Sequence, residues 1–426
     1  MKLTDAEKAM LDGAAGPAKQ RAMDLLVRYG EALGAERLVA VTNVAGTWNA
    51  ASPLVRPFAD KGGMDAVFSK FNLDADDVVE TPQAEVYTCQ LIHGIDTRNA
   101  GVTGVSEEVA ERQREAEKYF GQRGVAMFNT CTPYQVGNVP VRGEHCAWME
   151  SSAVVYCNAV LGARTNTEGR ESTGAASITG RIPYWGLHVP ENRRATHCVD
   201  VEVDVESMMD WGLLGYYVGE IVEEDIPVIA GIRETPSMIK LKHFGAAASS
   251  SGGVEMYHIP GVTPEAESVE QALGGGAPVE TIRYCAAERR QAYEWLNSIA
   301  SSDRVDFVML GCPHASVEQV RLAARLLDGK RLSENTALWI FTPRALKDTA
   351  DLSGYTEIIE RAGGHVLSDT CPAIGRVLPK GTKVVATDSA KQAHYLPAIM
   401  NVECWFGSVE DCIEAALTGR WRGSVR

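Results

Sequence analysis

The sequence predicts an α/β fold with mainly parallel sheets, and three observations support this class. Short β-branched runs recur along the chain, among them VAMFNT, THCVDVEV, DFVMLG, ALWIFT and KVVATD. Segments 106–120 and 286–299 carry charged residues on one helical face. Strands that alternate with helices are typical of parallel sheets covered by helices. A chain of 426 residues is also long enough for several lobes, which we place at approximately 1–125, 126–285 and 286–426.

The N-terminal segment predicts two helices and a strand. Apolar residues recur at helical spacing over residues 6–33, and Gly13 and Pro17 interrupt the pattern. Thr4 is the expected N-cap of the first helix, because Glu7 follows three residues later as in a capping box. The run ERLVAVTNVAG then predicts the first strand.

A glycine- and serine-rich stretch, GAAASSSGG, occupies residues 245–253. Its composition is that of a flexible linker. Apolar residues flank it on both sides, however, which favours a loop at an active site. We expect irregular structure here.

The overall charge of −15 argues against nucleic acid or an anionic membrane as a partner. Apolar residues make up 45% and charged residues 23% of the chain, as in an ordinary globular protein. No apolar run is long enough to span a bilayer, and MKLTDAEKAM begins a helix rather than a signal peptide. The ten cysteines are irregularly spaced, which favours reduced thiols over a disulfide scaffold. We expect a cytoplasmic protein.

Three of the cysteines differ from the rest in their surroundings. Cys131, Cys312 and Cys371 each follow a hydrophobic, β-like run and stand at or near a proline. Open α/β folds place their chemistry where parallel strands end, so these thiols can converge. An iron centre held by three thiolates keeps one position for a substrate hydroxyl, as a dehydratase requires. The alternative is that Cys-Pro simply ends strands.

The other cysteines are expected to be small buried hydrophobic residues. They are Cys89, Cys146, Cys157, Cys198, Cys285, Cys404 and Cys412.

The stretch MESSAVVYCNAVLGARTN predicts a helix that begins at Glu150 and Ser151 and ends near Gly162. The hydroxyls of Ser151 and Ser152 then lie at the positive end of this helix. Free N–H groups and the helix dipole favour a carboxylate there. This helix start is therefore a candidate site for an anionic substrate.

Five further polar residues have two interpretations each. Arg164 and Asn166, past the other end of this helix, either cap and turn the chain or contact substrate and orient Glu150. His314 either hydrogen-bonds a leaving hydroxyl or supports the iron ligands from behind. Lys391, with His394, either contacts the substrate or only supports its loop.

Long blocks of the chain resemble the large-subunit core of the aconitase X family, iron-dependent hydro-lyases of the aconitase superfamily. These blocks are NTCTPYQVGNVPVRGEHCAWMESSAVVYCNAVLGARTN, ITGRIPYWGLHVPENRRATHCVDV, HFGAAASSSGGVEMYHIPGVTPEA, VMLGCPHASVEQV and SDTCPA. The resemblance implies an aconitase-like fold, with parallel α/β lobes around a central iron site.

The resemblance also implies roles for particular residues. It implies Cys131, Cys312 and Cys371 as ligands of iron or an iron–sulfur cluster. No CxxC pair is present, so the number of irons stays open between a mononuclear centre and a cluster. Glu150 and His314 are implied as catalytic residues. Substrate contacts are implied for Ser151, Ser152, Arg164, Asn166 and Lys391.

In this superfamily the catalytic base is a serine on a small swivelling domain, fused to the large one or made separately. The glycine-rich signature of the swivelling domain, GGxDxxTG, is absent from this sequence. The resemblance therefore implies a separate small swivel-domain subunit as partner, and a chain that is inactive alone.

The substrate expected from the resemblance is a small hydroxy acid. Known activities in the family are dehydration of cis-3-hydroxy-L-proline and of mevalonate 5-phosphate. Two loops depart from the family pattern, VTNVAGTWNAASPLVRPF and VVETPQAEVYTCQLIHGIDTRN, and near them only Arg56, Lys61 and Arg98 are basic. Because a phosphate needs several basic groups or a glycine-rich nest, we expect the hydroxyproline-type substrate.

Three alternatives stay open. The chain is the large subunit of a mevalonate 5-phosphate dehydratase, or a non-catalytic relative that binds iron or a small acid. In the third, Cys312 is a nucleophile paired with His314.

Overall fold

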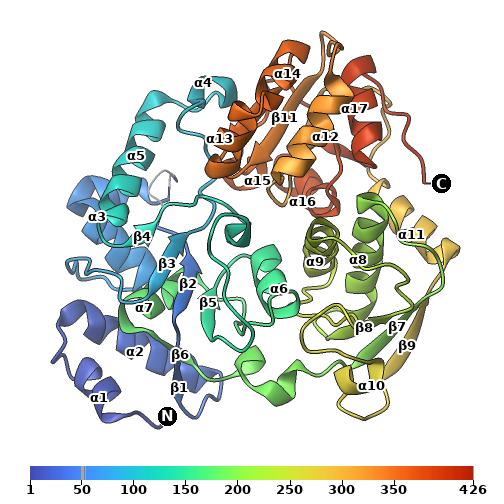
Figure 1. Cartoon of the computed structure of the whole chain (residues 1–426). Coiled ribbons are helices and arrows are strands. Elements are labelled where there is room, and N and C mark those ends of the chain that lie inside the picture. The colour runs from blue at the N-terminus through green and yellow to red at the C-terminus, as the bar shows by residue number, and fades with distance from the viewer. Residues whose placement is uncertain (49–51, 53, 426) are drawn as a thin grey trace.

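The computed structural model describes residues 1–48, 52 and 54–425, and its strands form four sheets within that part (Figure 1). Every strand pair in the three larger sheets is parallel, and helices cover the sheets. The predicted α/β class with mainly parallel sheets is therefore confirmed. Residues 49–51 and 53, in the first of the two divergent loops, lie outside the described part.

The N-terminal part is built on a four-stranded parallel sheet of order β4-β3-β2-β5. Its strands are β2 (Asn43–Gly46), β3 (Tyr87–Gln90), β4 (Val125–Ala126) and β5 (Cys146–Trp148). A separate antiparallel pair joins β1 (Leu38–Ala40) to β6 (Arg181–Pro183). The helices of this part are α1 (Asp5–Leu11), α2 (Pro17–Ala32), α3 (Arg56–Asn72), α4 (Ala100–Thr103), α5 (Glu107–Gly121), α6 (Ser151–Ala159) and α7 (Arg170–Thr179).

The middle part of the chain holds a three-stranded parallel sheet of order β8-β7-β9. Its strands are β7 (His197–Val201), β8 (Pro227–Ala230) and β9 (Glu280–Tyr284). The helices here are α8 (Met208–Val222), α9 (Met238–Ser251), α10 (Val269–Ala272) and α11 (Ala286–Leu296), and short 3-10 turns span Pro133–Gln135, Gly186–His188 and Pro190–Arg193.

The C-terminal part holds a five-stranded parallel sheet of order β12-β11-β10-β13-β14. Its strands are β10 (Phe307–Leu310), β11 (Ala337–Thr342), β12 (His365–Ser368), β13 (Val384–Thr387) and β14 (Glu403–Phe406). Its helices are α12 (Val317–Leu327), α13 (Arg344–Leu352), α14 (Tyr355–Ala362), α15 (Pro372–Gly375), α16 (Ala390–Met400) and α17 (Val409–Thr418).

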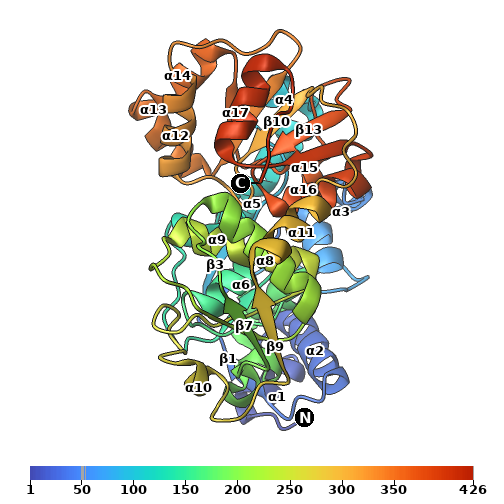
Figure 2. The ribbon, with the colours of Figure 1, turned by 90° about the vertical axis from the view of Figure 1, so that its right-hand side faces the viewer.

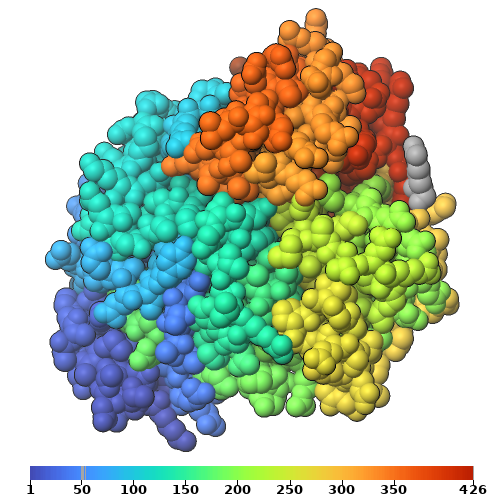
Figure 3. Space-filling model, viewed as in Figure 1, coloured from blue at the N-terminus to red at the C-terminus, as the bar shows by residue number. Residues whose placement is uncertain are grey.

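The three parts pack against one another. Figure 2 shows the C-terminal sheet and its helices above α8, α9 and the three-stranded sheet, and Figure 3 shows the C-terminal part in contact with the earlier parts of the chain on one face. One continuous apolar cluster joins α8 and α9 to the C-terminal sheet through buried aromatic side chains, including Trp211, Phe244, Phe307 and Trp339. Met309 and Cys312 belong to this cluster, so the candidate site rests on closely packed apolar side chains.

Several local predictions are confirmed. Thr4 caps α1 in a capping box with Glu7, and α2 begins at Pro17. The run predicted as one first strand instead forms two, β1 and β2, which belong to different sheets. The sheet β4-β3-β2-β5 takes strands from both sides of residue 125, and the three-lobe division stays a prediction.

The expected loop over residues 245–253 is wrong, because most of this stretch lies in helix α9. The small side chains let α9 approach α8 closely. A Cβ placed on Gly215 of α8 would lie 2.3 Å from the carbonyl oxygen of Phe244, and one on Gly219 would lie 2.4 Å from that of Ala248. Glycine, alanine and serine here serve helix packing rather than flexibility.

None of the helices in the described part of the chain is both long and apolar enough to span a bilayer.

Candidate active site

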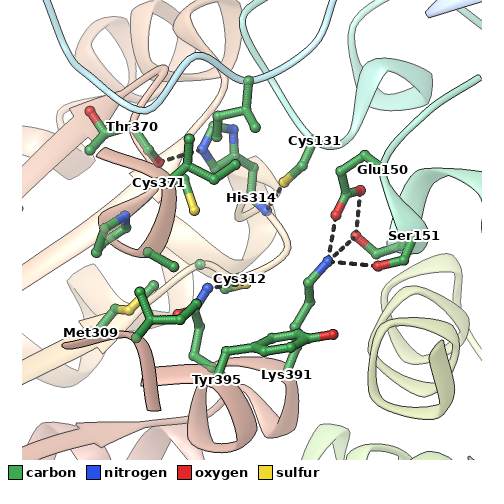
Figure 4. A pocket seen from close by; sticks show the side chains of 18 residues that line it. Cys131, Glu150, Ser151, Met309, Cys312, His314, Thr370, Cys371, Lys391 and Tyr395 are labelled. Atoms are coloured by element: carbon green, nitrogen blue, oxygen red, sulfur yellow. Dashed lines mark hydrogen bonds and ion pairs between the residues drawn. The ribbon is translucent and has the colours of Figure 1, made fainter. Parts of the chain in front are cut away.

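A cavity of about 250 Å³ lies where the loops after β10 and β12 meet the start of α6 and one face of α16 (Figure 4). Eight of the ten predicted site residues line this cavity. They are Cys131, Glu150, Ser151, Ser152, Cys312, His314, Cys371 and Lys391. Neighbouring apolar side chains, among them Ile92, Met309 and Tyr395, complete its wall.

The three singled-out cysteines come from separate segments and share this cavity. Cys312 lies two residues after β10, and Cys371 precedes α15 as its N-cap. The Cys131 sulfur accepts a hydrogen bond from the backbone N–H of His314 at 3.4 Å. The Cys312 sulfur accepts one from Nε2 of Gln392 at 3.0 Å. N–H donors at sulfur stabilise a thiolate over a thiol.

Burial opposes ionisation of these thiols. It raises the pKa of Cys371 to about 12 and raises the pKa of Cys131 and Cys312 as well. The ammonium of Lys391 acts in the opposite direction on all three. A nearby cation is therefore what this set of sulfurs needs to be held as thiolates.

Glu150 is fixed at the start of α6. Its φ is +79°, which is unusual for a residue other than glycine and marks a constrained position. Its carboxylate accepts hydrogen bonds from the backbone N–H of Ala153 at 2.9 Å and from the hydroxyl of Ser152 at 2.7 Å. The predicted helix that begins at Glu150 and Ser151 is confirmed.

Lys391 on α16 faces this helix start. Its ammonium donates to Oε1 of Glu150, to Oγ of Ser151 at 3.2 Å and to Oγ of Ser152 at 3.3 Å. Figure 4 shows these interactions on one side of the cavity. Burial disfavours the Lys391 charge, but Glu150 and Cys312 outweigh it and raise the pKa of Lys391. The lysine therefore stays charged.

Both ring nitrogens of His314 are engaged. Nε2 lies 3.0 Å from the carbonyl oxygen of Thr370, which can only accept, so Nε2 carries the proton. Nδ1 then accepts from the hydroxyl of Thr130 at 2.8 Å. Burial lowers the pKa of His314 to about 4, so the ring is neutral. This arrangement suits a residue that positions the Cys312 turn, and its predicted catalytic role stays a prediction.

Arg164 and Asn166 do not line this cavity. The side chain of Asn166 accepts from the backbone N–H of Leu187 at 2.8 Å and donates to the carbonyl of Trp185 at 3.3 Å. Arg164 lines a different cavity, beyond the other end of α6. His394, predicted as a companion of Lys391, is hydrogen-bonded to Tyr216 instead. The turn-forming interpretation therefore fits Asn166.

Two supporting residues were not predicted from the sequence. Lys242, buried on α9, donates to the carbonyl of His314 at 2.8 Å and to Oε1 of Gln319 at 2.7 Å. Burial lowers its pKa to about 8. Gln392 follows Lys391 directly and binds Cys312. For Gln392, its position beside a predicted site residue was a sequence signal that could have indicated this role. For Lys242 the sequence offered none, since it has the pattern of an ordinary lysine on the surface of a helix.

Comparison with known proteins identifies the family. Models of the aconitase X first, second and third domains match residues 1–191, 195–294 and 305–418. The phosphomevalonate dehydratase large subunit of Methanocaldococcus jannaschii is 36% identical over 97% of this chain and 100% of its own length. The chain belongs to the aconitase X family.

Other members of the aconitase X family are equally similar. The cis-3-hydroxy-L-proline dehydratase of Hypocrea jecorina is 35% identical over 98% of this chain and 69% of its own length. The crystal structure of holo-form aconitase X from Thermococcus kodakaraensis superposes with a TM-score of 0.81 and 34% identity, covering 98% of this chain and 100% of that one. The predicted aconitase-like fold is confirmed.

Proposed function

We propose that this chain carries the iron site and much of the substrate pocket of a hydro-lyase that removes water from a small hydroxy acid, cis-3-hydroxy-L-proline being the preferred substrate. One observation carries the proposal. The Lys391–Glu150 pair and the hydroxyls at the start of α6 line the same cavity as Cys131, Cys312 and Cys371. A carboxylate anchor and a set of metal donors are thus combined in one small space.

The donor set fits iron in its chemistry. Three sulfur donors suit iron centres, and N–H groups reach two of the sulfurs. Within the part of the chain that the structure describes, no group of His, Cys, Asp and Glu is arranged to hold a metal ion as it stands, so the side chains must adjust on loading. Bound iron would supply a Lewis acid for the departing hydroxyl. All ten cysteines are unpaired, in keeping with a reducing cytoplasm.

The charged pair suits an amino acid as substrate. The Lys391 ammonium, the Ser151 hydroxyl and the N-terminus of α6 can bind a carboxylate together. The Glu150 carboxylate can then receive the substrate's ammonium group. A ligand with one carboxylate and one amine would therefore replace the Lys391–Glu150 interaction with two equivalent ones and leave neither charge unpaired.

A phosphate fits this cavity less well. Lys391 is the one basic side chain among the described residues that line it, and Glu150 already neutralises it. Two of the three basic residues near the divergent loops also have partners. Arg56 pairs with Glu108 at 2.6 Å, and Arg98 pairs with Asp348 at 3.1 Å.

Dehydration of mevalonate 5-phosphate is nevertheless the second candidate. The observation in its favour is the similarity to proteins named phosphomevalonate dehydratase large subunit, including that of Methanothermobacter thermautotrophicus, which is 38% identical over 93% of this chain. Phosphate contacts would then have to come from outside this cavity.

The catalytic base is proposed to come from a partner, a small swivel-domain subunit that carries a serine. The rim of the cavity supports a covering partner. Ile374 and Ile399 line it, yet their side chains are 55% and 41% exposed. Exposed apolar side chains at the mouth of a pocket are typical of a surface that another chain covers.

The test is a turnover assay on the anaerobically iron-loaded chain, alone and with a small subunit of the family. Pyrroline carboxylate formed from cis-3-hydroxy-L-proline only after the subunit is added is the expected result. Turnover of mevalonate 5-phosphate instead would support the second candidate. An iron-loaded complex that turns over neither compound would overturn the proposal.

A further inference from the structure

A second cavity of about 490 Å³ lies where the first and second aconitase X domains meet, and arginines dominate its wall. Its charged lining consists of Arg142, Arg164, Arg193, Arg194 and Glu265. Among the described lining residues Glu265 is the one carboxylate. This concentration of positive charge stands out in a chain with a net charge of −15.

One of the four arginines is already bound within the protein. The guanidinium of Arg193 reaches both oxygens of Glu265, at 3.1 and 2.9 Å, and donates to the carbonyl of Leu187 at 3.1 Å. Arg193 is 2% exposed. Arg193 therefore stabilises the wall of this cavity, and it also neutralises the charge of Glu265.

The other three arginines have no such partner. Over the described part of the chain, the side chains of Arg142, Arg164 and Arg194 make no hydrogen bond or ion pair, and Nε of Arg164 is buried. Two glycines, Gly162 and Gly274, leave space for the methylene groups of Arg142 and Arg194. A Cβ on Gly162 would lie 3.2 Å from Cγ of Arg142, and one on Gly274 would lie 2.7 Å from Cδ of Arg194.

A buried histidine with one free nitrogen also lines this cavity. His258 is 2% exposed. Its Nε2 donates to the carbonyl of Arg193 at 2.7 Å, whereas its buried Nδ1 has no hydrogen-bond partner in the described residues. An unpaired buried polar atom costs free energy unless a ligand satisfies it. Because Nε2 holds the proton, Nδ1 needs a partner that can donate.

We propose that this arginine pocket, defined by Arg142, Arg164, Arg194 and His258, binds a phosphate group. Guanidinium forks recognise phosphate oxygens with two parallel hydrogen bonds. Hydrogen phosphate carries an O–H as well as negative charge, so it can also donate to Nδ1 of His258. An ionised carboxylate has no proton to offer there, which favours phosphate.

The arginine pocket is separate from the cavity that holds the cysteines. Glu150 lies at the start of α6, and Arg164 lies five residues after its end at Ala159. A nine-residue helix is about 14 Å long. The ligand is therefore not the substrate of the proposed dehydration, and the inference does not depend on that proposal.

The test is isothermal titration calorimetry of the purified full chain with inorganic phosphate, with ionic strength held constant by chloride. We expect one saturable site. Arg142→Gln and Arg194→Gln should each weaken binding by about tenfold or more, as for loss of hydrogen bonds between charged groups. Arg28→Gln, on the exposed face of α2, is the matched control and should bind normally.

Further titrations distinguish a phosphate monoester from inorganic phosphate as the ligand. Methyl phosphate bound as tightly as the free ion would assign the pocket to phosphate monoesters, and binding of the free ion alone would assign it to inorganic phosphate. Lys391→Gln should leave binding intact. The proposal is overturned if phosphate does not saturate, if citrate binds and phosphate does not, or if Lys391→Gln abolishes binding while the arginine variants keep it.

Discussion

Lys391 donates a hydrogen bond to the carboxylate of Glu150, joining α16 of the C-terminal part to the first turn of α6 across 241 residues of sequence. Both side chains are mostly buried, at 13% and 16% exposure. The pair therefore closes one side of the cavity and presents two opposite charges to whatever enters it.

Lys391→Gln removes the cation that is proposed to hold the substrate carboxylate. Because a hydrogen bond to a charged group contributes about 1.5–3 kcal/mol, kcat/KM of the complete enzyme should fall about tenfold to a hundredfold. Steady-state kinetics with the small subunit present measures this. Lys8→Gln, at an exposed ion pair on α1, should retain full activity. Equal activity of Lys391→Gln and Lys8→Gln would remove Lys391 from the site.

Gln392→Leu tests the support given to Cys312. Nε2 of Gln392 donates to the Cys312 sulfur, while its Oε1 is buried without a partner in the described residues. Leucine removes the Nε2 donor and also the unpartnered Oε1. The free energy of unfolding should therefore be kept, while iron should bind about tenfold more weakly. Chelator competition measures iron affinity, and Gln83→Leu, at an exposed side chain that donates to Gln122, is the control. Unchanged iron affinity would show that Gln392 serves packing alone.

Glu168→Gln should change how stability depends on pH. Burial, with Glu255 nearby, raises the pKa of Glu168 from 4.5 to about 7, so the folded state prefers the protonated acid. The stability that this proton contributes is complete below pH 4.5 and is lost as pH rises through about 7.

Urea unfolding at about pH 5 and about pH 8 measures this difference. Between these two pH values the free energy of unfolding should fall by as much as about 3 kcal/mol more in the wild type than in Glu168→Gln. This follows from about 1.4 kcal/mol for each pKa unit. The exposed neighbour Glu171, changed to Gln, is the control. An equal change in the free energy of unfolding for the wild type and Glu168→Gln between the two pH values would contradict the raised pKa of Glu168.

Gly215→Ala should destabilise the protein, because its Cβ would lie 2.3 Å from the Phe244 carbonyl oxygen and would push α8 and α9 apart. We expect a loss of about 3 kcal/mol in the free energy of unfolding. Gly101→Ala on α4, with no described atom within 4 Å of its Cβ, should be neutral or stabilising. Urea unfolding of both variants tests the close packing of α9, and equal stability would argue against it.

Local sequence rules predicted those parts of the fold in which neighbouring residues decide the structure. The capping box at Thr4 and Glu7 and the start of α6 at Glu150 depend on residues three apart, and both are present. The approach of Cys312 and Cys371 follows from a topological rule, because they come after β10 and β12, which are parallel strands of one sheet. Cys131 follows β4 of another sheet, so its place in the same cavity depends on the packing of the two sheets together.

Long-range packing decided the rest. The stretch at 245–253 has the composition of a linker, and its close contact with Gly219 of α8 shows why small residues suit a helix interface there. Arg164 is close to Glu150 in sequence, but α6 carries it to another cavity. Lys242 is buried against the turn at His314 and against Gln319 of α12, both far away in sequence. No pattern within one segment reveals such contacts.

Iron and sulfide quantification on the anaerobically reconstituted chain tests the central claim most directly. The account predicts bound iron in the wild type, its loss in Cys131→Ser, Cys312→Ser and Cys371→Ser without loss of folding, and its retention in Cys157→Ser, whose sulfur is buried outside the cavity. Absence of iron from the wild type, or equal loss in Cys157→Ser, would contradict the assignment of the three cysteines as its ligands.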